Sequence, residues 1–219
     1  MSTVYDCIDP QGRRDGVDAA VRAVNRGELV VLPTDTVYGV AADAFSKIAV
    51  RALLAAKGRG RDKPPPVLVG SRRTLDGIAC DISSLTRDLV DAFWPGALTL
   101  ICWAQPSLAW DLGETKGTVA VRMPDHDVAL EVLSRLGPTA VSSANRTASP
   151  PATSSAQARE ELGESVAVYL DAGPTAGAVP STIVDVTGAT PRVLRAGALS
   201  LQRIREVAPA VRGGEEEDE

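Results

Sequence analysis

The chain has few of the residues that usually hold metals, form disulfides or stack nucleic-acid bases. Its three cysteines, Cys7, Cys80 and Cys102, lie far apart and form no CxxC pair, which argues against a disulfide framework and a zinc ribbon. The single histidine, His126, excludes multi-histidine metal sites and leaves any Ser-His-Asp chemistry dependent on one residue. Aromatic residues make up 4% of the chain, which is sparse for a protein that binds single-stranded nucleic acid by stacking.

Long apolar runs are also missing. The longest, 97–104, is far shorter than the roughly 18 residues that a membrane helix needs. The N-terminal segment MSTVYDCIDPQGRRDG has no apolar stretch behind a basic start, which would mark a signal peptide. These absences predict a cytoplasmic protein with no membrane partner.

Net charge is concentrated at one end. The chain carries −5, and its last seven residues, GGEEEDE, hold five acids and no base, so residues 1–212 are neutral. A neutral body argues against a general nucleic-acid binder. With 219 residues, 44% of them hydrophobic, we expect one domain over 1–212 and an acidic, disordered tail over 213–219.

Helical and strand patterns are interleaved along the chain. After an irregular lead-in, helices are predicted over 15–26, 46–56, 71–80, 84–93, 125–136, 154–162 and 200–208, with Asp15 and Ser46 as N-caps. Strands are predicted over 28–32, 67–70, 98–103, 118–123 and 139–142, and within 166–173, 181–187 and 192–197. This alternation predicts an α/β fold with a twisted, mixed parallel and antiparallel sheet covered by helices.

Polar residues, most of them hydroxyl-bearing or cationic, adjoin several predicted strands. They are Thr34, Asp35 and Thr36, then Arg122, then Ser143 and Asn145, then Ser181 and Thr182, and finally Arg195. Ligands of open α/β sheets bind outside the strand ends, so these residues are candidates for one crevice. The alternative is that each of them only caps a helix or a turn.

The segment 57–63, KGRGRDK, is the strongest local signal. It has four cations against one acid, with glycines between the cations. Glycine lets the backbone approach an anion, and Arg and Lys bind phosphate oxygens, so the segment suits a polyphosphate; the alternative is a mobile basic surface loop. The chain contains no G-x-x-x-x-G-K-[ST] loop, no dinucleotide fingerprint and no G-x-S-x-G elbow around Ser143.

Seven motifs occur in an order and spacing that are familiar from one family. They are PTDTVYGV (33–40), KGR (57–59), FWPGALTL (93–100), VAVRMP (119–124), SSAN (142–145), STIVD (181–185) and VLRAG (193–197). Together they resemble the YrdC-like family, the L-threonylcarbamoyladenylate synthases. The resemblance runs from about residue 15 to residue 207.

The resemblance implies a fold with a deep, basic cavity and a nucleotidyltransferase reaction. ATP, L-threonine and bicarbonate would give threonylcarbamoyl-AMP and pyrophosphate, with Mg²⁺ accompanying ATP. A separate tRNA threonylcarbamoyl transferase complex would then form threonylcarbamoyladenosine at position 37 of tRNAs that read codons beginning with A.

The resemblance also assigns roles to individual residues. Lys57 and Arg59 would face the triphosphate, and Ser143 and Asn145 would hold the nucleotide and its metal, so these four are the candidate catalytic residues. Thr34, Arg122 and Ser181 would hold threonine. Thr118, Val141, Pro151 and Arg195 match positions that line the nucleotide. Arg61 is a further candidate for the ATP site because of its charge alone, since it is a cation that the family pattern lacks. No acidic cluster is available for the metal, so ATP would supply most of its ligands.

Three departures from the family pattern lie in or near the predicted site. Gly60 stands where the family has proline, Pro65-Pro66 replaces a leucine, and Arg195-Ala196-Gly197 replaces Arg-Pro-Gly. The chain resembles the single-domain form of the family. Two alternatives stay open: a non-catalytic RNA- or tRNA-binding module that uses the same cavity, and a relative with the same fold that acts on another small substrate. Direct contact with tRNA also stays open.

Overall fold

The structure is a computed structural model and describes residues 2–214. The strands are β1 (Thr3–Asp6), β2 (Val30–Leu32), β3 (Gly39–Asp43), β4 (Val67–Leu68), β5 (Ala79–Cys80), β6 (Leu98–Ala104), β7 (Thr118–Arg122), β8 (Thr139–Ser143), β9 (Val168–Asp171), β10 (Thr182–Asp185) and β11 (Arg192–Arg195). The helices are α1 (Pro10–Asn25), α2 (Lys47–Lys57), α3 (Thr74–Ile78), α4 (Ser84–Phe93), α5 (Asp127–Leu136), α6 (Ser155–Leu162) and α7 (Leu201–Val207), with a 3₁₀ turn at Gly163–Ser165.

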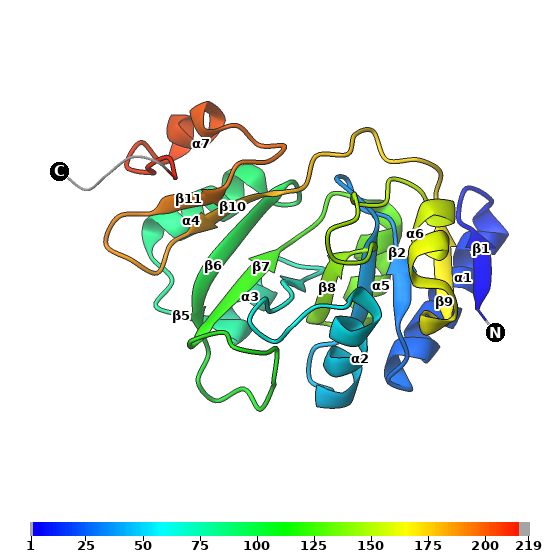
Figure 1. The fold of residues 1–219 in the computed structure, drawn as a ribbon. Helices are drawn as coiled ribbons and strands as arrows, with labels where there is room; N and C mark the ends of the chain where they lie inside the picture. The colour runs from blue at the N-terminus through cyan, green and yellow to red at the C-terminus, as the bar shows by residue number, and fades with distance from the viewer. Residues whose placement is uncertain (1, 215–219) are drawn as a thin grey trace.

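All of these strands join one sheet in the order β1-β9-β2-β3-β8-β4-β7-β6-β10-β11, with β5 paired to β6. The pairs β1/β9, β2/β9, β4/β7 and β6/β10 are parallel. The other pairs, such as β3/β8 and β6/β7, are antiparallel. β1 and α7 lie at opposite ends of the molecule (Figure 1). The predicted mixed α/β sheet is therefore confirmed.

The β1-to-β8 half of the sheet has helices on both faces. Apolar residues of α1 and α5 pack with β2, β8 and β9 on one face, and those of α2 and α6 pack with β2, β3 and β9 on the other. Strands β2, β3, β8 and β9 are short and buried along almost their whole length, as expected for strands that are covered on both sides.

The β7-to-β11 half buries one face and leaves the other to the candidate site. Its core is built from β6, β7 and β10 with α3, α4 and α7, around the fully buried Trp94. Because side chains alternate along a strand, Leu100 and Val121 point into this core, whereas Ile101 and Arg122 line a cavity. The two-residue strand β4 joins the halves, since it pairs with both β7 and β8.

Several predicted boundaries were wrong. The first helix begins at Pro10 rather than at residue 15, because Asp9 accepts a hydrogen bond from the Gly12 amide and proline occupies the first turn. The predicted helix over 71–80 is only α3, since residues 79–80 pair with β6 instead.

Three strands were not predicted, for different physical reasons. β1 lies at the sheet edge with mostly exposed residues, so it has no apolar pattern. β3 consists of Gly, Val, Ala, Ala and Asp, which are mostly poor strand formers, and β5 has only two residues. The strand β3 begins at the last two residues of the motif PTDTVYGV (33–40).

None of the helices within residues 2–214 combines the length and the apolar character that crossing a bilayer requires. Most of the predicted acidic tail, residues 215–219, lies outside the described residues.

Candidate functional site

A cavity of about 360 Å³ lies over the open face of β6, β7 and β10 and extends to β3, β8 and the loop after α2. Its wall carries three arginines, Arg59, Arg122 and Arg195, and no aspartate or glutamate among the described residues. The other polar side chains on the wall are Thr34, Thr36, Tyr38, Thr99, Thr115, Thr118, Ser142, Ser143 and Ser181. Such a wall of cations and hydroxyls suits an anionic ligand.

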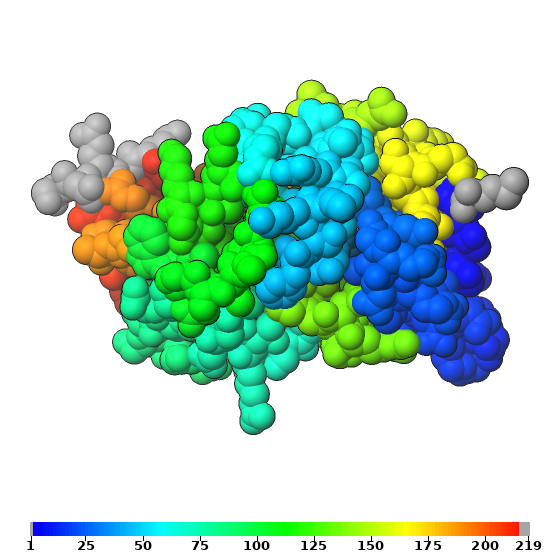
Figure 2. All heavy atoms as spheres, turned by 90° about the horizontal axis from the view of Figure 1, so that it is seen from below, coloured from blue at the N-terminus to red at the C-terminus, as the bar shows by residue number. Residues whose placement is uncertain are grey.

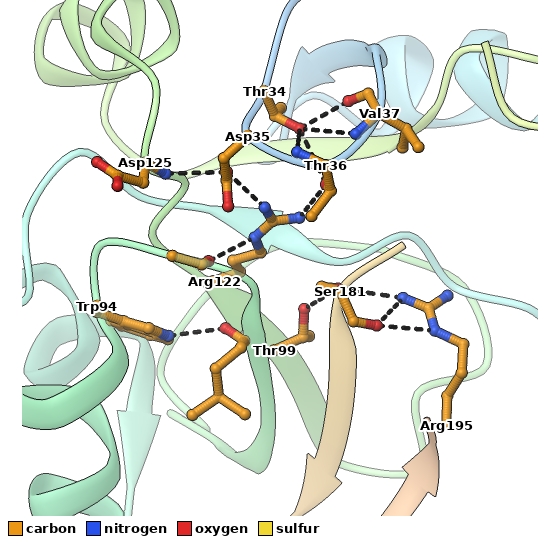
Figure 3. Close-up of polar contacts among 12 residues, drawn as sticks. Thr34, Asp35, Thr36, Val37, Trp94, Thr99, Arg122, Asp125, Ser181 and Arg195 are labelled. Carbon is orange, nitrogen blue, oxygen red and sulfur yellow. Dashed lines mark hydrogen bonds and ion pairs between the residues drawn. The ribbon is translucent and has the colours of Figure 1, made fainter. Parts of the chain in front are cut away.

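Arg122, the last residue of β7, is held on three sides (Figure 3). Its Nη2 donates to the Asp35 carboxylate at 2.6 Å, Nη1 donates to Thr36 Oγ1 at 2.9 Å, and Nε donates to the Gly96 carbonyl at 2.9 Å. Burial lowers the pKa of Arg122, and the adjacent Asp35 opposes that shift. A guanidinium has five N–H groups and stays charged in proteins, so two N–H groups remain for a ligand carboxylate.

Ser181 and Arg195 form the neighbouring part of the wall (Figure 3). Arg195 Nη2 donates to the Ser181 carbonyl at 2.7 Å and to its Oγ at 3.1 Å. The Ser181 hydroxyl also lies 2.7 Å from Thr99 Oγ1. Desolvation lowers the pKa of Arg195, and the positive charges of Arg122 and Arg59 lower it further. Because Arg122 and Arg59 disfavour the charged form of Arg195, an anion bound between the three arginines would be stabilised.

Thr34 shapes the loop between β2 and β3. Its Oγ1 donates to the Val37 carbonyl at 2.6 Å and accepts from the Thr36 and Val37 amides. A threonine hydroxyl that bonds the backbone two or three residues on forms a local turn. Thr34 lines the cavity, and the same turn carries the Asp35 and Thr36 side chains toward Arg122.

Lys57 lies behind the cavity wall, at the end of α2. It is 3% exposed, and its Nζ donates to the carbonyls of Ser143 and Asn145. Burial, aided by the charge of Arg59, lowers its pKa to about 8. Lys57 therefore holds the loop that follows β8, and it adds positive charge behind the cavity.

Two polar atoms beside Lys57 have no partner. Arg59 Nη1 donates to Ser142 Oγ at 3.1 Å, yet its Nε is buried with no hydrogen-bond partner. Asn145 Oδ1 is likewise buried and unpartnered. Leaving such groups unsatisfied costs roughly 1–3 kcal/mol each, so a ligand or water that bonds them would be favoured.

The structure brings most of the predicted site residues to one cavity. Those on its wall are Thr34, Arg59, Thr118, Arg122, Val141, Ser143, Pro151, Ser181 and Arg195. Lys57 and Asn145 lie behind the wall, while the Arg61 side chain pairs with Asp111 at the surface. Asp35 and Thr36 were among the candidates for one crevice but were given no role in the site. Thr99 was missed, because it sits inside a strand with no sequence signal.

The protein alone offers few metal ligands. Among residues 2–214 no group of three His, Cys, Asp or Glu side chains is placed to hold a metal ion. Ser143 Oγ, on the cavity wall, and the unpartnered Asn145 Oδ1 beside it are side-chain oxygens of the kind that Mg²⁺ binds. His126 lies at the start of α5 with its Nδ1 buried and unpartnered, and it is not on the cavity wall.

A family model named Sua5/YciO/YrdC, with the description "Telomere recombination", matches residues 22–197. A protein of Mycobacterium tuberculosis is 56% identical over 207 residues, covering 94% of this chain and 95% of that protein. Threonylcarbamoyl-AMP synthase of Bacillus subtilis is 35% identical over 202 residues, covering 91% of this chain and 57% of that enzyme.

Solved structures agree with these relatives. Pyrococcus abyssi Sua5 complexed with L-threonine superposes with a TM-score of 0.89 and 32% identity, covering 97% of this chain and 62% of that one. Escherichia coli YciO has the same fold, with a TM-score of 0.83, 23% identity, and 93% and 100% of the two chains covered. This chain thus spans about three fifths of the Sua5 chain. The protein belongs to the Sua5/YciO/YrdC family.

Proposed function

We propose that the protein is an L-threonylcarbamoyladenylate synthase. It takes ATP, L-threonine and bicarbonate and forms threonylcarbamoyl-AMP and pyrophosphate. The observation that carries this proposal is the cavity wall, which places Arg59, Arg122 and Arg195 around one space without a carboxylate among its described residues. The names of the relatives and the threonine-bound Sua5 structure support the same substrate.

The proposed reaction has two steps. The threonine amine adds to bicarbonate, water leaves, and an N-carboxy-threonine forms. A carbamate oxygen then attacks the α-phosphorus of ATP, and the bond to pyrophosphate breaks. Neither step needs a covalent enzyme intermediate, so positioning and charge stabilisation account for catalysis.

The two substrates fit different parts of the wall. The free N–H groups of Arg122 suit the threonine carboxylate, with the Ser181 and Thr34 region beside them. Arg59 and Arg195 suit the phosphates, and Thr118, Val141 and Pro151 line the remaining space for the nucleoside. Lys57 adds its charge from behind and keeps Ser143 and Asn145 in place.

Mg²⁺ and the onward use of the product complete the proposal. Mg²⁺ would enter with ATP and take most of its ligands from the phosphates, while Asn145 Oδ1 and Ser143 Oγ are the protein oxygens suited to it. The bound cation supplies charge neutralisation for the pyrophosphate that leaves. Threonylcarbamoyl-AMP is a reactive mixed anhydride, which suits its use by a separate tRNA threonylcarbamoyl transferase complex.

Pyrophosphate release tests the activity. The pure protein is incubated with ATP, Mg²⁺, bicarbonate and L-threonine, and parallel reactions omit threonine or bicarbonate or replace threonine with serine. We expect release that requires both threonine and bicarbonate. Release with another amino acid would retain the chemistry and reject the substrate. No release, together with tight binding of RNA, would instead support the non-catalytic binding module.

A further inference from the structure

Arg61 belongs to the basic segment after α2, yet its side chain turns away from the cavity wall. Its Nη2 donates to Asp111 Oδ1 at 2.7 Å and its Nη1 donates to Asp111 Oδ2 at 3.2 Å. This is a two-point pairing of guanidinium and carboxylate, which is more directional than a single contact. The Arg61 side chain is 45% exposed and that of Asp111 22%, so the ion pair by itself is weak.

Backbone contacts reinforce the pair. The Glu114 amide donates to the Arg61 carbonyl at 2.8 Å. Gly113 has φ +113°, and a Cβ at this position would lie only 2.6 Å from the same carbonyl. Glycine is therefore required for the chain to approach Arg61 this closely. Asp111, Gly113 and Glu114 thus all contact Arg61, one residue of the basic segment.

An aromatic contact holds segment 105–117 to the start of α2, at the opposite end of that helix from the basic segment. Phe45, just before α2, stacks on Trp110 with ring centroids 5.6 Å apart and an interplanar angle of 25°. Figure 2 shows the surface of the region around α2 and the basic segment (cyan) directly beside that of the segment leading to β7 (green). The ring stack and the charge pair involve the adjacent residues Trp110 and Asp111, so both act on segment 105–117.

Both joined segments contribute to the cavity wall. From segment 105–117, Leu112 and Thr115 line the cavity, and the Thr115 carbonyl accepts hydrogen bonds from the amide and hydroxyl of Thr118. Arg59 of the basic segment lines it, and so do Pro64–Pro66, which follow that segment directly. A change in how the two segments meet would therefore move the wall on the side where Thr118 faces the proposed nucleotide.

We propose that Arg61 and Asp111 form a latch that holds segment 105–117 against the basic segment and so positions Leu112, Thr115 and Thr118 for ATP. Arg61 is then a positioning residue that acts through Asp111, rather than a ligand of the triphosphate. This inference rests on the proposed function for its kinetic test. Its structural part can be measured without any turnover.

Charge reversal separates the two roles of Arg61. We expect R61D and D111R each to raise KM for ATP about three- to fivefold with kcat nearly unchanged, the size of a lost exposed ion pair. The double variant R61D/D111R restores the pair and should return KM to within about twofold of the unmodified protein. A direct phosphate ligand behaves differently: R61D and R61D/D111R would both be impaired, and the conservative variant D111N would have no effect.

Hydrogen exchange of segment 105–117 provides a readout that does not depend on activity. R61D and D111N should both speed exchange in this segment, and the double reversal should slow it again. D76N is the matched control, because the exposed pair of Arg87 and Asp76, 2.9 Å apart, lies off the cavity wall. Unchanged exchange in both R61D and D111N would overturn the latch. If the unmodified protein releases no pyrophosphate but the variants change hydrogen exchange as expected, only the proposed function would be rejected.

Discussion

Arg122 and Asp35 are the residues on which the proposed threonine end of the cavity depends. Asp35 accepts from Arg122 at 2.6 Å and from the Asp125 amide at 2.9 Å. Arg122 contacts the ligand directly in our proposal, whereas Asp35 fixes its orientation. Because the pair is largely buried, removing one charge leaves the other uncompensated.

We therefore expect Asp35→Asn to lower the free energy of unfolding by about 2–3 kcal/mol, in the range for a hydrogen bond to a buried charge. The same substitution should raise KM for threonine, since the Arg122 guanidinium loses its orientation. Urea unfolding and initial rates measure the two effects. Asp76→Asn, which breaks an exposed pair, should change stability by less than about 0.5 kcal/mol; equal losses in both variants would contradict the role of Asp35.

We expect Lys57 to make nucleotide binding depend on pH. Its pKa of about 8 lies below the ordinary 10.5, so the amine loses its charge as pH rises through 8. ATP phosphates are already ionised in this range. Affinity for ATP should thus fall on the order of tenfold between pH 7.5 and about 9.5, as a cation near the phosphates becomes neutral.

The control for this pH effect is Lys57→Met, in which the charge is absent throughout. Its ATP affinity should be low and nearly independent of pH over the same range. Calorimetric titration at several pH values measures both proteins. A flat profile of ATP affinity against pH in the unmodified protein, or a parallel fall in the variant, would rule out Lys57 as the cause.

The proposed catalytic role of Lys57 is tested by turnover. Turnover of Lys57→Ala should drop on the order of 100-fold, as when other charge-stabilising groups are lost.

At the scale of elements, the sequence prediction and the structure differ in where α1 begins and in which aspartate caps it. Asp9 accepts from the Gly12 amide at 2.7 Å, whereas Asp15, the predicted cap, accepts from the Gln11 side chain within the helix. Asp9→Ala should therefore destabilise the protein by about 1 kcal/mol, the usual value of an N-cap. Asp15→Ala should cost less than about 0.5 kcal/mol. Chemical unfolding that ranked the two in the opposite order would favour the shorter helix.

The elements that were predictable are those in which burial imposes a period. Ser46 caps α2 as predicted, and the helix at 84–93 has the predicted limits, because each has an apolar stripe behind a hydroxyl cap. β3 could not be predicted, since its Gly39–Asp43 sequence owes its strand conformation to pairing with β2 and β8. At β3, pairing with neighbouring strands determines the conformation, and the intrinsic strand propensity of its residues does not.

The same distinction holds in the site. Residues at strand ends, such as Arg122, Ser143 and Arg195, could be grouped from sequence because strand ends converge in an α/β sheet. The partner of Arg61 could not, because Asp111 lies 50 positions away in an irregular segment. Charge alone placed Arg61 among the phosphate ligands, and only its geometry shows that the charge is already paired.

At the scale of the whole molecule, the cavity lies where the two halves of the sheet meet. Arg59 is tied to the β8 half, because it donates a hydrogen bond to Ser142 of β8. Arg195 belongs to the other half, since it is the last residue of β11 and donates to the Ser181 carbonyl. Between them the sheet is continuous only through the two residues of β4. A ligand that contacts both arginines therefore bridges the halves and binds only the folded protein.

Binding to the folded state alone raises stability by mass action. With Mg²⁺ present and ATP at about 100 times its Kd, the free energy of unfolding should rise by about 2.7 kcal/mol.

Two variants test whether the nucleotide contacts both halves. Arg59→Ala removes a contact on the β8 half, and Arg195→Ala removes one on the β11 half. If each weakens ATP binding about tenfold, the stabilisation at the same ATP concentration should fall by about 1.4 kcal/mol in either variant. Arg87→Ala, off the cavity wall, should retain the full stabilisation. Should ATP stabilise Arg195→Ala as much as the unmodified protein, the nucleotide would bind one half only, and the bridging arrangement would be wrong.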